Sequence, residues 1–151
     1  MSYSVFLPSY SIGTDVYDRI KEICPSYGKS VVVIGGKTAM EKAKEKIKAA
    51  IADSPFEILD FIWYGGDSSF ENVEMLKENP LVHKADMIFA VGGGRAIDTC
   101  KVLAHQLNKS IFTFPTIASN CAPCTSVCVM YDNKGVFKEL YFRDKPANHT
   151  F

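Results

Sequence analysis

Apolar positions follow a strand-like pattern and then a helix-like pattern, and this alternation recurs along the chain. Residues 31–34 form a continuous run of β-branched side chains, which is typical of a strand buried on both faces of a parallel sheet. From Met40 to Ile51 apolar residues then repeat at helical spacing, with lysines between them. The lysines therefore indicate the solvated face of an amphipathic helix rather than a binding patch.

The same patterns predict the other elements. Further strands are expected at about 3–7, 56–63, 87–91 and 111–114, and further helices at about 15–24, 69–78 and 96–107. Ser68 or Ser69 is expected to cap the helix that follows it, and Pro80 to stop that helix.

The order of these elements predicts the fold class. Strand and helix alternate four times, which calls for a parallel sheet covered by helices on both faces. Residues 127–131 and 136–142 alternate like strands around the turn signal at 132–135, so they should pair as a β-hairpin. We therefore expect one α/β domain over residues 1–151, a Rossmann-like parallel sheet flanked by helices, with a β-hairpin near the C-terminus.

Composition excludes several classes of protein. The chain has 151 residues, of which 47% are hydrophobic, as expected for a folded domain with one core. Seventeen Lys and Arg residues balance seventeen Asp and Glu residues, so charge gives no reason to expect nucleic acid or an anionic membrane as partner. No apolar run approaches the ~18 residues that span a bilayer, and the start does not resemble a secretory signal. A cytoplasmic location is the resulting expectation.

Five cysteines form an odd set, so reduced thiols used as small apolar side chains are the simplest interpretation. Cys121 and Cys124 form a C-x-x-C motif. A redox motif of this kind needs a helix N-terminus, whereas a β-branched, strand-like run follows here. A zinc site that also used Cys128 would need a fourth ligand, and no histidine is adjacent.

The residues with the most informative chemistry are Gly92–Gly94, between a predicted strand and a predicted helix. Glycines here allow positive φ and let backbone N–H groups approach an anion closely, as a diphosphate requires. A tight strand-to-helix turn is the alternative, but such a turn needs only one glycine. The spacing is not the Rossmann G-x-G-x-x-G. Residues 36–38, Gly-Lys-Thr, lack the first glycine of a Walker A motif.

With the glycine loop placed, the sequence resembles the iron-containing (group III) alcohol dehydrogenase superfamily, which includes glycerol dehydrogenases. Three segments carry the resemblance, in the correct order: Pro8–Tyr10 with Gly13, residues 92–98 with Lys101, and the loop 115–131. In the last of these, Pro115–Ser119 is followed by Ala122–Pro123 and the strand 127–131. The resemblance covers essentially the whole chain.

The resemblance implies the NAD(P)-binding half of a two-domain dehydrogenase that transfers hydride between a nicotinamide and a small alcohol or carbonyl. A helical domain, expected beyond Phe151, would supply an aspartate and histidines as ligands to Fe²⁺ or Zn²⁺. No metal ligand or catalytic residue is expected in this chain. Alone, it should therefore not catalyse the reaction. The implied cofactor-binding residues are Gly36, Lys37, Gly93, Gly94, Arg95, Asp98, Thr116, Ser119, Thr125, Val127 and Tyr131, with Cys121 close to the substrate. A homo-oligomer formed through an edge strand is a further suggestion.

Two departures from the family pattern affect specificity. NAD-preferring members carry an acidic residue where this chain has Gly36, followed by Lys37, so we predict that NADP(H) is accepted. Glycerol dehydrogenases carry an aspartate where this chain has Cys121, which makes glycerol doubtful and favours 2-oxo and 2-hydroxy acids.

Other functions remain open at this stage. They are a glycerol or glycerol-1-phosphate dehydrogenase-like domain and a non-catalytic nucleotide-binding module. His83, in a predicted loop, His105, on a predicted helix, and His149, near the end of the chain, are expected to have surface or packing roles.

Overall fold

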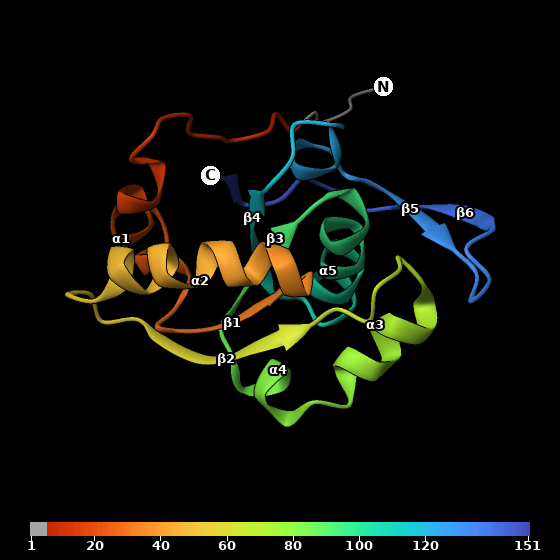
Figure 1. Ribbon diagram of the computed structural model, residues 1–151, viewed down its shortest axis with the longest axis horizontal. Helices are drawn as coiled ribbons and strands as arrows, with labels where there is room; N and C mark the ends of the chain where they lie inside the picture. Colours follow the sequence, from red (N-terminus) through yellow and green to blue (C-terminus); the bar gives the residue numbers. More distant parts are fainter. Residues whose placement is uncertain (1–5) are drawn as a thin grey trace, which may run out of the picture.

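The computed structural model describes residues 6–151 (Figure 1). The strands are β1 Ser30–Gly35, β2 Glu57–Trp63, β3 Met87–Gly92, β4 Ser110–Pro115, β5 Val127–Tyr131, β6 Phe137–Phe142 and β7 His149–Thr150. The α-helices are α1 Ile20–Ile23, α2 Lys37–Ile51, α3 Phe70–Lys77, α4 Pro80–Lys84 and α5 Gly94–Gln106, and the 3₁₀ turns are η1 Val16–Arg19, η2 Pro25–Tyr27 and η3 Ala122–Cys124.

Five strands form one parallel sheet in the order β2-β1-β3-β4-β7, and β5 and β6 form a separate antiparallel hairpin. The predicted α/β class, parallel sheet and hairpin are confirmed. In residues 6–151 no helix is both long enough and apolar enough to cross a membrane.

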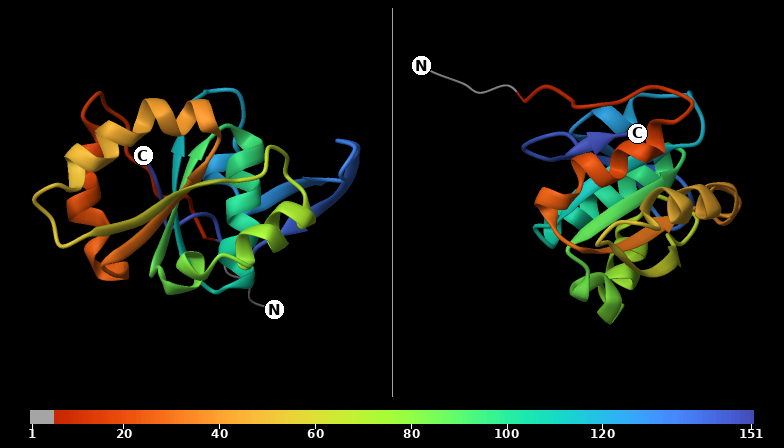
Figure 2. Two further views of the ribbon diagram at one scale, coloured as in Figure 1. Left: turned by 60° about the horizontal axis from the view of Figure 1, so that its bottom comes forward. Right: turned by 90° about the vertical axis from the view of Figure 1, so that its left-hand side faces the viewer.

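Helices cover both faces of the sheet (Figure 2). Val31 and Val33 on β1 pack with α1 and α2, whereas Val32 and Ile34 pack with α3, α4 and α5. All four side chains are fully buried. The continuous apolar run is therefore explained by alternate residues that enter opposite cores, as expected for a central parallel strand.

The first and last segments of the described chain differ from the prediction. Most of the strand predicted at 3–7 lies outside the described residues, and Phe6 and Leu7 belong to no strand. The unpredicted strand β7 completes the sheet, and the backbone N–H of Thr150 donates to the carbonyl of Ser9. His149 is buried and its ring nitrogens lie 2.7 and 2.9 Å from the hydroxyls of Ser9 and Ser11, which is a packing role.

The helix caps correct one prediction and confirm another. Ser69 caps α3 by accepting a hydrogen bond from the backbone N–H of Asn72 at 3.2 Å. Pro80 does not stop that helix, which ends at Lys77, but opens α4, where the side chain of Asn79 accepts from the N–H of Leu81. Proline suits the first position of a helix because its missing N–H would have no partner there. His83 therefore lies on α4 and not in a loop.

Candidate functional site

Two strand-to-helix turns, β1–α2 and β3–α5, lie side by side at the carboxyl edge of the sheet. The backbone N–H of Gly36 donates to the carbonyl oxygen of Val91 at 3.3 Å, so the two turns are in direct contact. A Cβ added to Gly35 would overlap that same carbonyl oxygen. Only glycine therefore allows β1 and β3 to come this close at their ends.

The β3–α5 turn also depends on glycine. Gly92 has φ +147°, a conformation that residues with a side chain rarely adopt. Its carbonyl accepts a hydrogen bond from the N–H of Thr116 at 3.1 Å, which ties this turn to the loop after β4. The chain then enters α5 directly at Gly94, with Gly93 as the capping residue.

The helices that begin at these turns, α2 and α5, differ from α3 and α4 in how their first N–H groups are satisfied. Helices α3 and α4 are capped by the side chains of Ser69 and Asn79. Helices α2 and α5 begin after Gly36 and Gly93, and neither has a side-chain cap. The first-turn N–H groups of α2 and α5 therefore lack the side-chain acceptor that usually satisfies them. Such N–H groups form the kind of site that binds phosphate.

Helices α2 and α5 each carry a cationic side chain in the first turn, where the helix dipole disfavours positive charge. Lys37 is the first residue of α2 and Arg95 is the second residue of α5, and neither helix has an acidic residue in its first turn. The partial positive charge of a helix N-terminus stabilises anions and repels cations. Two cations at two adjacent positive ends make physical sense if a ligand with several negative charges lies between them.

Aromatic rings hold both cations. The ammonium of Lys37 lies 4.6 Å from the centre of the Trp63 ring, and the guanidinium of Arg95 lies 5.1 Å from the centre of the Tyr131 ring. Arg95 also approaches Asp67, with Nη1 3.5 Å from Oδ1. These contacts orient the two side chains without a close carboxylate partner for Lys37 in the described residues.

Two cavities flank the glycine loop and contain most of the predicted residues. The first, of about 480 Å³, is lined by Gly36, Lys37 and Thr116 of the predicted set, together with Trp63 and Tyr64. The second, of about 370 Å³, is lined by Gly94, Arg95, Asp98, Cys121, Thr125, Val127 and Tyr131, together with Asn120. The structure thus divides the predicted residues between two neighbouring cavities.

Two predicted residues line neither of these cavities. Gly93 lies under the side chain of Ile117, whose Cδ1 would be 3.0 Å from an added Cβ. Ser119 accepts a hydrogen bond from the Asn120 side chain at 3.1 Å. Trp63 and Asn120 were not predicted, because a tryptophan at the end of a strand and an asparagine in a loop carry no distinctive signal in one sequence.

A buried ion pair lies beside the second cavity, and its carboxylate residue, Asp98, lines that cavity. Lys101 is fully buried, and its Nζ lies 3.0 Å from Oδ1 of Asp98. The same Nζ donates to the carbonyls of Ala122 at 2.8 Å and Val127 at 2.7 Å, and Oδ2 of Asp98 accepts from the N–H of Val129 at 3.0 Å. These bonds join α5 to the loop before β5 and to β5 itself.

The C-x-x-C motif of Cys121 and Cys124 precedes a strand. Residues Ala122–Cys124 form a single 3₁₀ turn that is followed by β5, so the C-x-x-C motif does not open a helix. Burial raises the pKa of Cys128 to about 12, which keeps this thiol protonated at neutral pH. Within residues 6–151 no group of three or more His, Cys, Asp and Glu residues is arranged to hold a metal ion.

The comparisons with known proteins agree with this geometry. The family model described as "Iron-containing alcohol dehydrogenase" matches residues 8–148. The chain therefore belongs to the iron-containing alcohol dehydrogenase family, which confirms the resemblance inferred from the glycine loop.

Individual relatives are longer than this chain. It is 29% identical to a glycerol dehydrogenase of Escherichia coli over 85% of this chain and 35% of the relative. It is 32% identical to a glycerol-1-phosphate dehydrogenase [NAD(P)+] of Thermoplasma volcanium over 72% of this chain and 31% of the relative. The crystal structure of glycerol dehydrogenase from Schizosaccharomyces pombe superimposes with a TM-score of 0.86 at 25% identity, over 99% of this chain and 38% of that one. The chain thus spans about a third of the length of these relatives.

Replacement of Lys101 tests the buried ion pair. We expect Lys101→Met to reduce the free energy of unfolding by about 3 kcal/mol, because Asp98 would keep a buried charge without its partner. Lys109→Met is the matched control. The Lys109 ammonium also donates to two carbonyl groups, but it has no buried carboxylate partner. Urea unfolding of both variants measures the difference; an equal loss of stability in both would show that the ion pair itself contributes nothing.

Proposed function

We propose that this chain is the nucleotide-binding part of an NAD(P)-dependent dehydrogenase that interconverts a small alcohol and its carbonyl. The observation that carries the proposal is the pair of adjacent helix N-termini, each without a side-chain cap and each with a cation in its first turn. A dinucleotide has the two negative phosphates that this arrangement would stabilise. The relative from Thermoplasma volcanium, whose name includes NAD(P)+, supports the same cofactor class.

The proposed orientation follows from the two cavities. The diphosphate would be held by the backbone at Gly93 and Gly94, once the side chains of Ile117 and Asn120, which lie against these two glycines, move aside. The adenosine end would occupy the first cavity, beside Trp63. The nicotinamide end would occupy the second cavity, above Asp98 and beside Tyr131. Bound nicotinamide supplies or accepts the hydride; this chain's residues hold it in place and exclude water.

The rest of the catalytic apparatus is proposed to lie in another part of the protein. The relatives are about three times as long as this chain, and within residues 6–151 no cluster of metal-ligating side chains is present. We propose that a helical domain supplies the ligands of Fe²⁺ or Zn²⁺ and closes the site over the second cavity. A Lewis-acid metal at that place would polarise the carbonyl group of the substrate.

Arg95 provides a direct test of nucleotide binding at the glycine loop. In the full-length protein, Arg95→Gln should weaken the binding of NADH and NADPH alike by about tenfold, the equivalent of about 1.4 kcal/mol. The reason is that a charge-assisted bond to the diphosphate is lost. Calorimetric titration gives both dissociation constants.

Arg19→Gln is the matched control, because Arg19 lies on η1 and, within residues 6–151, forms an ion pair with Glu22 alone. Its affinities should equal those of the unmodified protein. The proposal would be contradicted by an unmodified protein that binds neither nucleotide. It would also be contradicted if Arg95→Gln left both affinities unchanged. Nucleotide binding without turnover on any alcohol or carbonyl would instead support the non-catalytic module.

We further propose that the β1–α2 turn accepts NADP(H). The place where NAD-preferring relatives carry a carboxylate is Gly36, so nothing repels a 2′-phosphate. Lys37 follows directly, lines the first cavity, and is held over Trp63 rather than by a carboxylate. A 2′-phosphate in this cavity would gain an ion pair and the favourable end of the α2 dipole.

Lys37→Gln tests this preference. The affinity for NADPH should fall by about tenfold, since one charge-assisted bond is worth about 1.5 kcal/mol, while the affinity for NADH should stay the same. Lys48→Gln, near the other end of α2, is the control and should change neither affinity. If Lys37→Gln weakened the binding of NADH and NADPH equally, Lys37 would contact the diphosphate or the adenine instead of the 2′-phosphate.

The substrate class rests on Cys121, which lines the second cavity and is exposed. A thiol is a weak acceptor and does not replace the carboxylate that glycerol dehydrogenases place there. We therefore propose 2-oxo acids as substrates in preference to polyols. Cys121→Asp should raise kcat/KM for glycerol by about tenfold, as expected for one restored hydrogen bond to a charged group. If the unmodified full-length protein oxidises glycerol faster than it reduces any 2-oxo acid, the 2-oxo acid proposal is wrong.

A further inference from the structure

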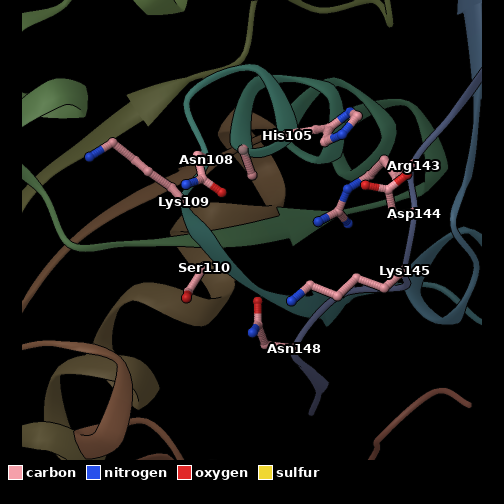
Figure 3. Close-up of a pocket in the computed structure, with 9 residues that line it drawn as sticks. His105, Asn108, Lys109, Ser110, Arg143, Asp144, Lys145 and Asn148 are labelled. Carbon is pink, nitrogen blue, oxygen red and sulfur yellow. The ribbon is translucent and has the colours of Figure 1, made fainter. Parts of the chain in front are cut away.

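A separate cavity lies at the amino edge of the sheet, opposite the glycine loop. It has a volume of about 280 Å³ and lies between the end of α5, the start of β4 and the segment 143–148 that leads to β7 (Figure 3). The nucleotide turns follow the carboxyl ends of β1 and β3, so this cavity belongs to neither half of the proposed cofactor site.

Arg143 is the most unusual residue of this cavity. Only 9% of the residue is exposed, and its Nε and Nη1 atoms are buried without a hydrogen-bond partner among the described residues. Figure 3 shows the guanidinium pointing into the cavity from the segment after β6. A buried guanidinium stays charged, and burial of a charge without a partner is costly. Burial lowers the pKa of Arg143, and the neighbouring Asp144 carboxylate offsets this only in part.

Other hydrogen-bond donors line the same cavity as Arg143. The ammonium of Lys145, the side-chain amide of Asn148 and the hydroxyl of Ser110 come from three further positions around the cavity (Figure 3). The Oδ1 atom of Asn148 already accepts from the N–H of Ile111 at 2.8 Å, which leaves the amide NH₂ for another partner. The Nδ1 atom of His105 lies 2.8 Å from the hydroxyl of Tyr141.

The remaining charged groups at this edge do not neutralise Arg143. Asp144 is the one carboxylate that lines the cavity; it is exposed, and the described residues show no ion pair between it and Arg143. The ammonium of Lys109 is turned away, toward the carbonyls of His83 and Ala85.

Neutralisation of the α5 dipole does not account for Arg143 either. The last carbonyls of α5 carry partial negative charge and favour a nearby cation. An arginine with this role would donate to one of those carbonyls, and neither Nε nor Nη1 of Arg143 has an acceptor. The C-terminus of α5 is an unfavourable place for an anion unless cations offset its dipole, and Arg143 and Lys145 both line this cavity.

We propose that this cavity binds a small tetrahedral oxyanion, either free phosphate or the phosphate group of a small monoester. The guanidinium of Arg143 would provide two parallel bonds to two of the oxygens, as arginine does for phosphate. Lys145, Ser110 and Asn148 would reach the others from different directions, which suits a tetrahedral ion better than a planar carboxylate. A cavity of about 280 Å³ exceeds the ~30 Å³ share of one water several-fold, so it has room for an ester group.

The test is a calorimetric titration of the full-length protein with inorganic phosphate, at ionic strength held constant with chloride. Phosphate should bind saturably, and Arg143→Gln should weaken this binding at least tenfold. Lys145→Gln changes an exposed side chain without risk to the fold, and it should weaken binding several-fold. A parallel titration with methyl phosphate distinguishes a phosphate monoester from free phosphate as the ligand. If methyl phosphate binds more tightly than phosphate, the ligand is a monoester; if it binds equally or more weakly, the ligand is the free ion.

Arg19→Gln is the matched control, because Arg19 lines neither this cavity nor the two cavities at the glycine loop, and it should bind phosphate as the unmodified protein does. Arg95→Gln identifies phosphate that binds at the glycine loop instead. The proposal is overturned if phosphate does not bind saturably. It is also overturned if Arg143→Gln and Lys145→Gln both keep full affinity, or if Arg95→Gln alone loses it. These outcomes do not depend on whether the glycine loop binds a dinucleotide.

Discussion

The close approach of two backbones at the carboxyl edge of the sheet is the constraint on which the rest of the structure depends. Gly35 has no Cβ, so the end of β1 can lie against the carbonyl of Val91, and Gly92 adopts a positive φ that turns β3 abruptly into α5. As a result, two helices begin next to each other without a side-chain cap for their first N–H groups. Lys37 and Arg95 then add positive charge to ends that are already positive. The proposed dinucleotide would offset this accumulation of positive charge.

Polar contacts add to apolar packing where α5 meets β5 and the loop before it. Lys101 and Asp98 reach from α5 to the loop before β5 and to β5 itself, and all of their partners except each other are backbone groups. A network of this kind is stable only when its members are satisfied together. It therefore gives the second cavity one geometry, which a site that orients a nicotinamide would require.

Local patterns in the sequence account for most of the fold, because the β-branched run at 31–34 and the glycines at 92–94 mark a buried strand and a strand-to-helix turn within a few residues. The two-residue strand β7 was missed because it has no periodicity of its own and forms through contacts with residues distant in sequence. The partners within the candidate site were beyond prediction for the same reason. No local signal places Lys37 over Trp63, or buries Arg143 with no hydrogen-bond partner for its Nε and Nη1 atoms in the described part of the chain. The family motif identified Lys101 as part of a signature, but only the three-dimensional structure shows what it bonds.

The most direct test of the central claim is amide hydrogen–deuterium exchange of the full-length protein with and without NADPH. Slower exchange on addition of nucleotide should appear in peptides that cover residues 35–40 and 92–97, where the two uncapped helices begin. Residues 69–73 of the side-chain-capped helix α3 should exchange at an unchanged rate. Unchanged exchange at both turns under saturating nucleotide, or slower exchange confined to other parts of the domain, would contradict the account.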